Sequence, residues 1–266
     1  MRRAKFSYSV SKFWTTLANY FSKGTTVLKK LLTASLITLS FSASAGAIRF
    51  GYNQQYSAPH VINNGKGTSV SGIVIDVSNA ISQEAGFMAK QLPLPRKRIE
   101  QYLIDGKIDA QCHANPIWYN APSIIWSEVL YSDADIIVSD QAIASLQALS
   151  SHKQFKLGTV LGYKYPNLTE YFEAGNLKRF NSTSSKDSLT RFTKGELDGF
   201  VASYSEANYL TRLRRFNVLE VNSYDLHCSF SPKLNAEKRQ RLIDAAHKLR
   251  DNGEFKRVFA KYIKPE

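Results

Sequence analysis

The stretch that decides the fold is residues 72–112, GIVIDVSNAISQEAGFMAKQLPLPRKRIEQYLIDGKIDAQC. Its apolar spacing predicts a helix, a strand, a helix and a strand in turn: Gly72–Gly86, Phe87–Leu94, Arg96–Leu103 and Ile108–Cys112. Asp76 is a good N-cap for the first helix, Gly86 ends it, and Pro95 opens the second. Because the apolar run Ile48–Tyr52 precedes them as a further strand, the order predicts a parallel sheet with right-handed crossovers.

A second round of alternating elements begins after Tyr131. Strands are expected at Asp135–Val138, Lys156–Leu161, Leu177–Phe180, Leu197–Ala202, Val218–Val221 and Leu226–Phe230. Helices are expected at Asn167–Glu173, Lys186–Thr193, Glu206–Arg215 and Ala236–Phe259, the last broken at Asn252-Gly253. The sequence therefore predicts two α/β units in one chain.

The N-terminus has the order of a secretory signal. Lys29-Lys30 precede an apolar run, Leu31–Phe41, and small residues follow at 42–47. The run would measure about 16 Å as a helix, against about 30 Å of membrane hydrocarbon, which favours a cleaved signal over an uncleaved anchor. Residues 1–47 are thus interpreted as an export signal peptide with a long n-region, cleaved after Ala45 or Ala47. We expect a periplasmic protein.

Charge and composition narrow the class of function. The formal charge is +13, but residues 1–47 hold seven Lys/Arg and no acid, and the other 219 residues carry 28 Lys/Arg and 22 Asp/Glu. No basic cluster interleaved with aromatics appears after residue 47, so no nucleic-acid partner is expected. Hydrophobic residues make up 43% of the chain, enough for a packed core.

Several segments in order resemble a known family. They are IRFGYNQQYSAPHVINNGKG at 48–67, SGIVIDVSNAISQEAGF at 71–87, LIDGKIDA at 103–110, IIWSEVLYSDADIIVSD at 124–140, KLGTVLG at 156–162, LTRFTKGELDGFVASYSEANYL at 189–210 and LNAEKRQRLIDAAHKLRDNGEFKRVFAKYI at 234–263. In this order the chain is similar to the family 3 solute-binding proteins of ABC importers, which have the type II periplasmic-binding-protein fold. The similarity covers most of the chain after the signal.

The resemblance implies two α/β lobes, each a mostly parallel sheet flanked by helices, joined by two hinge strands. Lobe 1 would be 48–134 plus 227–266, and lobe 2 would be 135–226. It also implies a monomer that captures a small-molecule solute between the lobes and presents it to an inner-membrane ABC permease or receptor. No catalysis, cofactor or metal is expected.

Two positions depart from the pattern of the amino-acid binders in this family. These usually carry T-x-x-R after the third strand, where Arg grips a carboxylate, but here residues 113–120 read HANPIWYN. The second-lobe strand usually ends in an Asp that holds the amino group, and here Ser203 stands in that place. The ligand is therefore not expected to be a standard amino acid held in the usual way.

The side chains that remain for the predicted cleft are mostly aromatic or neutral and polar. The candidate ligand-binding residues are Tyr52, Tyr56, Arg96, Asn115, Trp118, Tyr163, Ser203 and Glu206. Such a set suits a ring, a sugar or an organic cation. For each aromatic, packing in the core or hinge is the alternative interpretation, and for Arg96 it is a solvated helix rim or a docking surface.

The two cysteines, Cys112 and Cys228, come close in the type II topology, because the returning strand lies beside the third strand of lobe 1. A disulfide is one interpretation and two buried free thiols are the other. His113 and His227 are neighbours of these cysteines, but adjacent residues on a strand point to opposite faces. A shared metal site is therefore not expected.

Two other functions stay open. A small dehydratase-like enzyme could use the same fold, with Glu206 and His113 as acid/base candidates. No nucleophile elbow, H-E-x-x-H or P-loop motif occurs to support it, and the histidines are scattered: His60, His113, His152, His227 and His247. The third possibility is a sensory module that presents its ligand state to a membrane receptor.

Overall fold

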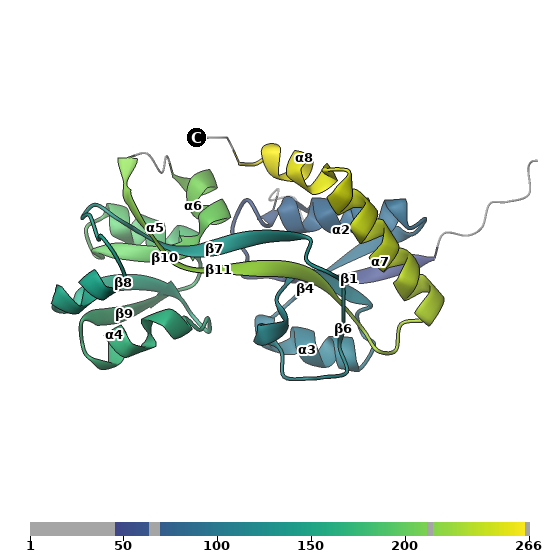
Figure 1. Cartoon of the computed structure of the whole chain (residues 1–266), viewed down its shortest axis with the longest axis horizontal. Helices are drawn as coiled ribbons and strands as arrows, with labels where there is room; N and C mark the ends of the chain where they lie inside the picture. Colours follow the sequence, from purple (N-terminus) through teal and green to yellow (C-terminus); the bar gives the residue numbers. More distant parts are fainter. Residues whose placement is uncertain (1–45, 64–69, 212–214, 264–266) are drawn as a thin grey trace, which may run out of the picture. The chain divides into compact units, whose positions relative to one another are not determined.

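The computed structural model describes residues 46–63, 70–211 and 215–263 (Figure 1). The predicted signal at 1–47 lies outside the described residues, except for its last two positions. The predicted cleavage after Ala45 thus falls at the edge of the described chain.

The first sheet is built from three parallel strands, in the order β4-β1-β5. Its crossovers are the helices α2 and α3, which lie on opposite faces of the sheet (Figure 1). This is the β-α-β-α-β unit that the alternating pattern predicts. The bounds are β1 Ala47–Asn53, α2 Ile73–Glu84, β4 Met88–Leu94, α3 Arg96–Ile104 and β5 Ala110–Ala114. A two-stranded ribbon, β2 Ile62–Asn63 with β3 Val70–Ser71, precedes α2.

The second sheet also has three parallel strands, in the order β10-β8-β9. Helices α5 and α6 cover one face, and α4 covers the other (Figure 1). The bounds are β8 Phe155–Val160, α4 Thr169–Glu173, β9 Leu177–Ser182, α5 Ser185–Thr193, β10 Gly199–Ser203 and α6 Tyr204–Leu210.

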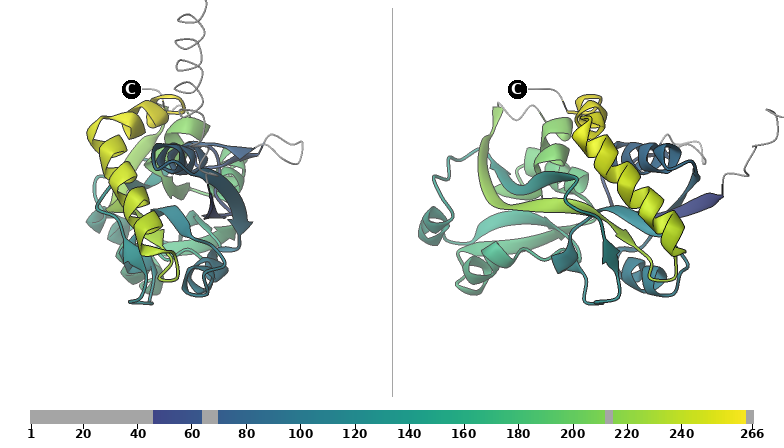
Figure 2. Two further views of the ribbon diagram at one scale, coloured as in Figure 1. Left: turned by 90° about the vertical axis from the view of Figure 1, so that its right-hand side faces the viewer. Right: turned by 45° about the vertical axis from the view of Figure 1, so that its right-hand side comes forward.

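Two long antiparallel strands join the sheets, β7 Tyr131–Ser139 and β11 Asn217–Phe230. Residues 217–226 of β11 pair with β7, which in turn pairs with β10. The last residues of β11 pair instead with β5 and with the short β6, Ile125–Trp126. The hydrogen-bonded ladder therefore continues from one sheet to the other through β11, and Figure 2 shows both strands running between them.

Each sheet is mixed, because its own strands are parallel and the joining strands add antiparallel pairs. The C-terminal helices α7, Ala236–Asp251, and α8, Glu254–Ala260, pack with α2 on the first sheet. Its other face is closed by α3 through buried Ile99 and Leu103. Two further apolar clusters cover the two faces of the second sheet. No helix among the described residues is both long enough and apolar enough to cross a membrane.

The structure corrects three details of the expected elements. Residues 217–230 form one strand rather than two, because the polar segment 222–225 continues the ladder with β7 after a bulge. Helix α6 ends at Leu210, short of the expected Arg215. Gly72, not Asp76, caps α2, and Asp76 lies in the first turn, where its charge still suits the helix dipole.

Candidate functional site

The loop after β1, residues 53–61, is held against the start of α2. The amide of Val74 donates to the carbonyl of His60 at 3.1 Å, so the loop satisfies a helix N–H group that has no partner inside the helix. Gly72 permits this approach, because its φ is 119° and a Cβ atom there would lie 2.5 Å from the His60 oxygen. The backbone around His60 is thereby fixed.

The His60 ring lies between two carboxylates that come from elsewhere in the chain. Its Nε2 is 3.5 Å from Asp133 Oδ2, and its Nδ1 is 3.7 Å from Glu206 Oε1. His60 is only 2% exposed. Burial alone would lower its pKa, but the two carboxylates outweigh burial and raise the pKa of His60 to about 9. The ring is therefore an imidazolium at neutral pH.

Asp133 projects from β7 toward the start of α6. Its carboxylate accepts hydrogen bonds from the Ser205 hydroxyl at 2.6 Å and from the Ser205 amide at 3.3 Å. Burial pushes the pKa of Asp133 upward, but His60 and Ser205 together hold it below its ordinary value. Asp133 is thus an ionised, well-paired carboxylate.

Glu206 connects three segments of the chain. The sequence S-Y-S-E at 203–206 has the form of a capping box, and the Ser203 hydroxyl accepts from the Glu206 amide at 3.1 Å. The Glu206 side chain leaves the box, however. It accepts from the Ser57 amide at 3.2 Å and from the Ser185 hydroxyl at 2.8 Å. A residue of α6 thereby binds the loop after β1.

His113 lies at the end of β5 on a β-bulge. Cys112 pairs with Cys228 and Ala114 pairs with His227, so His113 is the extra residue, with a left-handed φ of 65°. Its ring lies 4.4 Å from the His60 ring, centroid to centroid. Burial, together with the charge of His60, lowers the pKa of His113 well below its ordinary value. One histidine of the pair is therefore charged and the other neutral.

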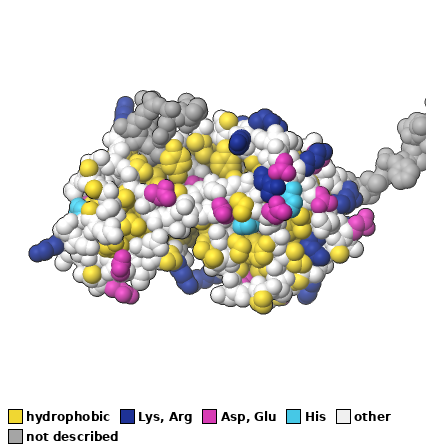
Figure 3. Space-filling model, viewed as in Figure 1, with side chains coloured by type: hydrophobic (Ala, Val, Ile, Leu, Met, Phe, Trp, Pro, Cys, Tyr) yellow, Lys and Arg dark blue, Asp and Glu magenta, His cyan; other side chains and the backbone are white. Residues whose placement is uncertain are grey.

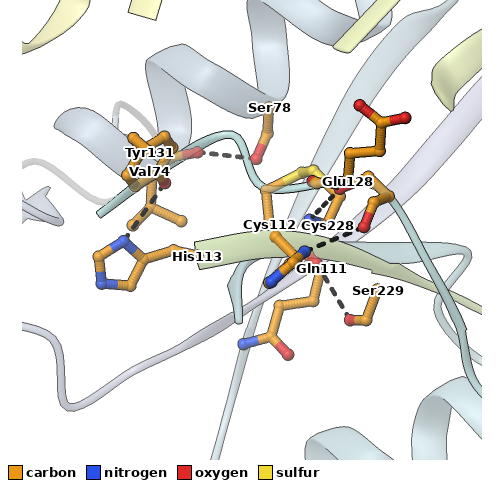
Figure 4. The surroundings of a disulfide bond; sticks show 11 residues. Val74, Ser78, Gln111, Cys112, His113, Glu128, Tyr131, Cys228 and Ser229 are labelled. Carbon is orange, nitrogen blue, oxygen red and sulfur yellow. Dashed lines mark hydrogen bonds between the residues drawn. A yellow bond between two sulfur atoms is a disulfide. The ribbon is translucent and has the colours of Figure 1, made fainter. Parts of the chain in front are cut away.

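Further contacts fix the orientation of His113. The Tyr56 hydroxyl donates to the His113 carbonyl at 3.2 Å, and the Tyr131 hydroxyl lies 3.3 Å from His113 Nδ1. Figure 4 shows His113 turned toward Tyr131 beside a disulfide that joins Cys112 and Cys228. Of the two states that the sequence left open for these cysteines, the structure has the bonded one. The disulfide at Cys112 thus fixes the chain one residue before the bulge that orients the His113 ring.

Asp135 lies two residues after Asp133 on β7, so its side chain is on the same face of the strand. It pairs in the ladder with Ser203, the last residue of β10. The Tyr224 side chain forms a hydrogen bond with the Asp135 carboxylate. Burial is the main cause that raises the pKa of Asp135 to about 7, and the nearby Asp133 and Glu206 add to it.

An aromatic rim lies at the start of α3. The Arg96 guanidinium is 5.5 Å from the Trp118 ring centroid and 5.6 Å from that of Tyr119. Trp118 also meets Tyr224 of β11 edge to face at 5.5 Å. Trp118 belongs to a short 3₁₀ turn, Pro116–Trp118, which Asn115 caps. All four rim side chains, Arg96, Trp118, Tyr119 and Tyr224, are partly exposed.

We call residues 53–61 with His113 the loop side of the site, and Asp133, Asp135 and Glu206 the acidic side. The loop side brings the imidazolium of His60, and the acidic side brings three carboxyl groups. On the face drawn in Figure 3, the surface is hollowed along the lower edge between the parts built on the two sheets.

The predicted ligand-binding residues fall into two groups. Tyr56, Arg96, Trp118 and Tyr163 are partly exposed around this site, and Ser203 and Glu206 lie at the start of α6. Tyr52 and Asn115 are buried, as Ser203 and Glu206 are. Tyr52 is 4% exposed and packs in an apolar cluster with α2, and the Asn115 amide donates to the Asp225 carbonyl at 2.8 Å.

The sequence interpretation missed His60, Asp133, Asp135 and Tyr224 as site residues. A signal for the two aspartates was present, because acids at alternate positions of a strand that enters an apolar run lie on one face. His60 follows Pro59 in a loop, and nothing local to it indicates a partner. Among the described residues, no three His, Cys, Asp or Glu side chains are arranged to hold a metal ion.

Comparisons with known proteins agree with this architecture. No protein-family profile matches the chain, and no curated protein matches it by sequence. Among solved structures, an ancestral cationic amino acid solute-binding protein superposes with a TM-score of 0.68 at 18% identity, covering 83% of this chain and 97% of that one. The chain has the fold of the two-lobed solute-binding proteins.

Two further structures share the solute-binding fold. An ancestral amino acid-binding protein, described as a precursor of cyclohexadienyl dehydratase, superposes with a TM-score of 0.67 at 18% identity, covering 85% of this chain and 99% of that one. A periplasmic binding protein of Salmonella typhimurium with high arginine specificity gives a TM-score of 0.63 at 17% identity, covering 83% and 100%. The likeness concerns the fold alone.

Within the solute-binding fold, the site occupies the place that sheet topology favours. His113 is the last residue but one of β5, Tyr163 follows β8 and Ser203 ends β10, so these side chains lie at the carboxyl ends of their strands. Ligands of open α/β sheets bind at that edge.

Proposed function

We propose that this protein is a periplasmic solute-binding protein that captures a small polar solute between two lobes, 48–134 plus 227–266 and 135–226. It acts as a monomer, delivers the solute to an inner-membrane ABC permease and catalyses nothing. The solute contacts are made by the partly exposed candidate residues Tyr56, Arg96, Trp118 and Tyr163, with Ser203 and Glu206 at the start of α6.

One observation carries the proposal: polar groups of both proposed lobes meet at the same site. The Ser57 amide donates to Glu206 at 3.2 Å, and the Asn53 side chain donates to the Tyr163 hydroxyl at 3.1 Å. Each of these hydrogen bonds joins the segment after β1 to the part of the chain between the hinge strands. Contacts of this kind form when two lobes close over a shared site.

The test is a thermal-shift screen of the purified protein against amino acids, amines, sugars and nucleosides. A solute at one hundred times its Kd adds about 2.7 kcal/mol to the free energy of unfolding, which is a clear shift of the melting temperature. Small-angle scattering with the same solute should show a smaller radius of gyration, and light scattering should give the mass of one chain.

A matched pair of variants locates the site. Arg96→Ala should weaken the response, whereas Arg98→Ala, two residues further along the same helix and exposed, should leave it unchanged. If no solute class stabilises the protein, the proposed function is wrong.

A dehydratase-like enzyme is the second candidate. It is favoured by the charged His60 beside the neutral His113, because such a pair can donate and accept a proton in a water-poor site. Proton NMR of each stabilising solute, incubated with the protein for a day, distinguishes the two candidates. Turnover that is lost in His113→Gln would establish the enzyme, and an unchanged spectrum supports the binding protein.

Periplasmic export is tested by expressing the full chain and fractionating the cells. We expect the protein in the periplasmic fraction, with a mature N-terminus at Gly46 or Ile48. A protein that stays in the membrane fraction with Arg2 and Arg3 intact would show an uncleaved anchor.

A further inference from the structure

We propose that Asp135 is the anchor for a protonated amine, so the solute of this site is an organic cation. This inference rests on the proposed function and names the chemical class of its solute. It depends on where the carboxyl groups of the acidic side stand and on which of them already have partners.

The first step is geometric. Residues at alternate positions of β7 share a face, so Tyr131, Asp133 and Asp135 point to the same side of the strand. Tyr224 lies opposite Asp133 in the ladder with β11 and belongs to the same face. Asp135 lies opposite Ser203, at the last position of β10. Asp135 thus brings a carboxyl group to the carboxyl end of β10 from the neighbouring strand.

The second step concerns hydrogen bonding. Asp133 and Glu206 each accept hydrogen bonds from the protein, including one from a serine hydroxyl within 2.8 Å. For Asp135, among the described residues, the hydrogen-bond partner is the Tyr224 side chain. Asp135 is also partly exposed, whereas Asp133 and Glu206 are buried. It is therefore the carboxyl group with room and acceptor capacity for a ligand.

The third step is an independent observation on His60. Both ring nitrogens of this buried side chain lack a hydrogen-bond partner, although they point at Asp133 and Glu206. At 3.5 and 3.7 Å, the contacts are charge pairs rather than hydrogen bonds. These N–H donors require an acceptor, which a protonated amine is not, so His60 marks an incompletely hydrogen-bonded polar cluster beside the carboxyl groups and does not itself bind the amine.

The fourth step is the balance of charge. Asp135 is faced by Asp133 on its own strand, Glu206 on α6, Tyr224 on β11 and Tyr165 after β8. Among the described residues, His60 is the buried cation beside these three carboxyl groups, and Arg96 stands farther out at the aromatic rim, so the carboxyl groups outnumber the nearby cations and leave an excess of negative charge. A protonated amine removes that excess, whereas an anionic ligand would add to it. Tyr224, which is partly exposed, supplies aromatic surface for the organic part of such a cation.

The experiment uses solutes of matched skeleton and different charge. One set is 1,4-diaminobutane, 1,4-butanediol and succinate, and a second is 2-phenylethylamine, 2-phenylethanol and phenylacetate. We expect calorimetry to show binding of an amine in at least one set. The alcohol and the acid of that set should bind at least about tenfold more weakly, as for a lost hydrogen bond to a charged group.

Two variants separate an anchoring role from a structural one. Asp135→Asn should weaken amine binding at least about tenfold and bring the affinity of the amine close to that of the alcohol. Asp225→Asn is the matched control, because Asp225 lies on the opposite face of the same pair of strands and bonds Ser132. It should bind the amine as the native protein does.

Proton release gives a readout that a purely structural role would not move. Because its pKa is raised to about 7, the Asp135 carboxyl group is partly protonated at pH 7. An amine that pairs with the charged form therefore releases protons when it binds. Titrations at pH 7 in phosphate and in Tris, which differ in ionisation enthalpy, should therefore give different binding enthalpies. In Asp135→Asn, this difference should shrink.

The outcomes distinguish this inference from the function on which it rests. If a neutral or anionic solute binds tightest, or if Asp135→Asn binds the amine as well as the native protein does, the inference is wrong and the solute-binding function stands. If neither amine set binds, the inference is also wrong. If no solute of the broad screen binds either, the proposed function falls with it.

Discussion

The loop side and the acidic side of the site differ both in charge and in how they are held. His60 and His113 of the loop side are placed by the start of α2 and by a bulge next to a disulfide. The acidic side is placed without a covalent link, by strand pairing for Asp133 and Asp135 and by the start of α6 for Glu206. The loop side therefore carries one cation, and the acidic side carries three carboxyl groups, of which Asp135 has the fewest hydrogen bonds.

The opposite charges of the loop side and the acidic side attract each other, but the positive charge of the loop side does not balance the negative charge of the acidic side. His60 neutralises part of the acidic side and leaves Asp135 without a cation of its own. We expect the loop side to contribute most to stability and the charge of Asp135 on the acidic side to serve recognition. Each of the following predictions tests one part of this division.

The largest effect is expected from removing the disulfide. Cys112→Ala with Cys228→Ala should lower the free energy of unfolding by about 5 kcal/mol, because the bond closes a loop with a sequence separation of 116. Denaturant unfolding measures the loss, and dithiothreitol should destabilise the native protein but not the double variant. An unchanged midpoint would mean that the loop side needs no covalent support.

The second effect is the loss of the imidazolium. His60→Gln should cost about 3 kcal/mol, because Asp133 and Glu206 then face each other without a buried cation. His152→Gln, a histidine outside the site, is the control. If both variants lose the same free energy of unfolding, the buried charge of His60 does not stabilise the protein as we expect.

The titration of His60 predicts how the free energy of unfolding depends on pH. The pKa of His60 rises from 6.5 when unfolded to about 9 when folded. Its stabilisation is therefore fully present below pH 6.5 and is lost as the pH rises through 9, by about 3 kcal/mol in all. The pKa of Asp135 is raised to about 7 in the folded protein. Its ionisation therefore also lowers the free energy of unfolding as the pH rises, in this case between about pH 4 and pH 7. Denaturant titrations from pH 6 to 10 should show the fall in the native protein and a flatter profile in His60→Gln.

A smaller effect, of opposite sign, is expected on the acidic side. Asp135→Asn should stabilise the empty protein by about 1 kcal/mol at pH 8, because the charged form of a buried carboxyl group is unfavourable. The gain should vanish at pH 5, where the native carboxyl group is protonated. A variant less stable than the native protein at pH 8 would show that Asp135 supports the fold.

The smallest change is expected at the aromatic rim. Trp118→Ala should abolish the solute-induced thermal shift and alter the melting temperature of the empty protein only slightly, because the ring is partly exposed. Ile117→Ala, at a position 77% exposed, is the control for the same turn. A collapse of stability in Trp118→Ala would place the ring in the core.

The comparison also shows what the sequence could predict. The alternation over residues 72–112 is local, so it indicated the strands and helices of the first sheet within a few positions. Residues 217–230 were divided wrongly because the polar segment 222–225 resembles a turn. Only its pairing with β7, a distant segment, holds it extended, and no local pattern reports such a partner.

The site was predictable only where the family resemblance places side chains. Glu206, Trp118 and Tyr56 follow strand ends and were named on that basis. The partnership of His60 with Asp133 was not, because their approach depends on the anchoring of the loop to α2 and on the register of β7. Asp135 was missed because its significance comes from the residue opposite, Ser203.

The late position of β11 in the chain has a consequence for the order of folding in the proposed export. In the export that we propose, the chain crosses the membrane from its N-terminus, so β7, β8, β9 and β10 emerge before β11 does. The second sheet can thus assemble most of its strands while the first sheet still lacks the strand that carries Cys228. Until that strand arrives, Cys112 is an unpaired thiol available to other oxidants, and maturation of the first lobe is completed last.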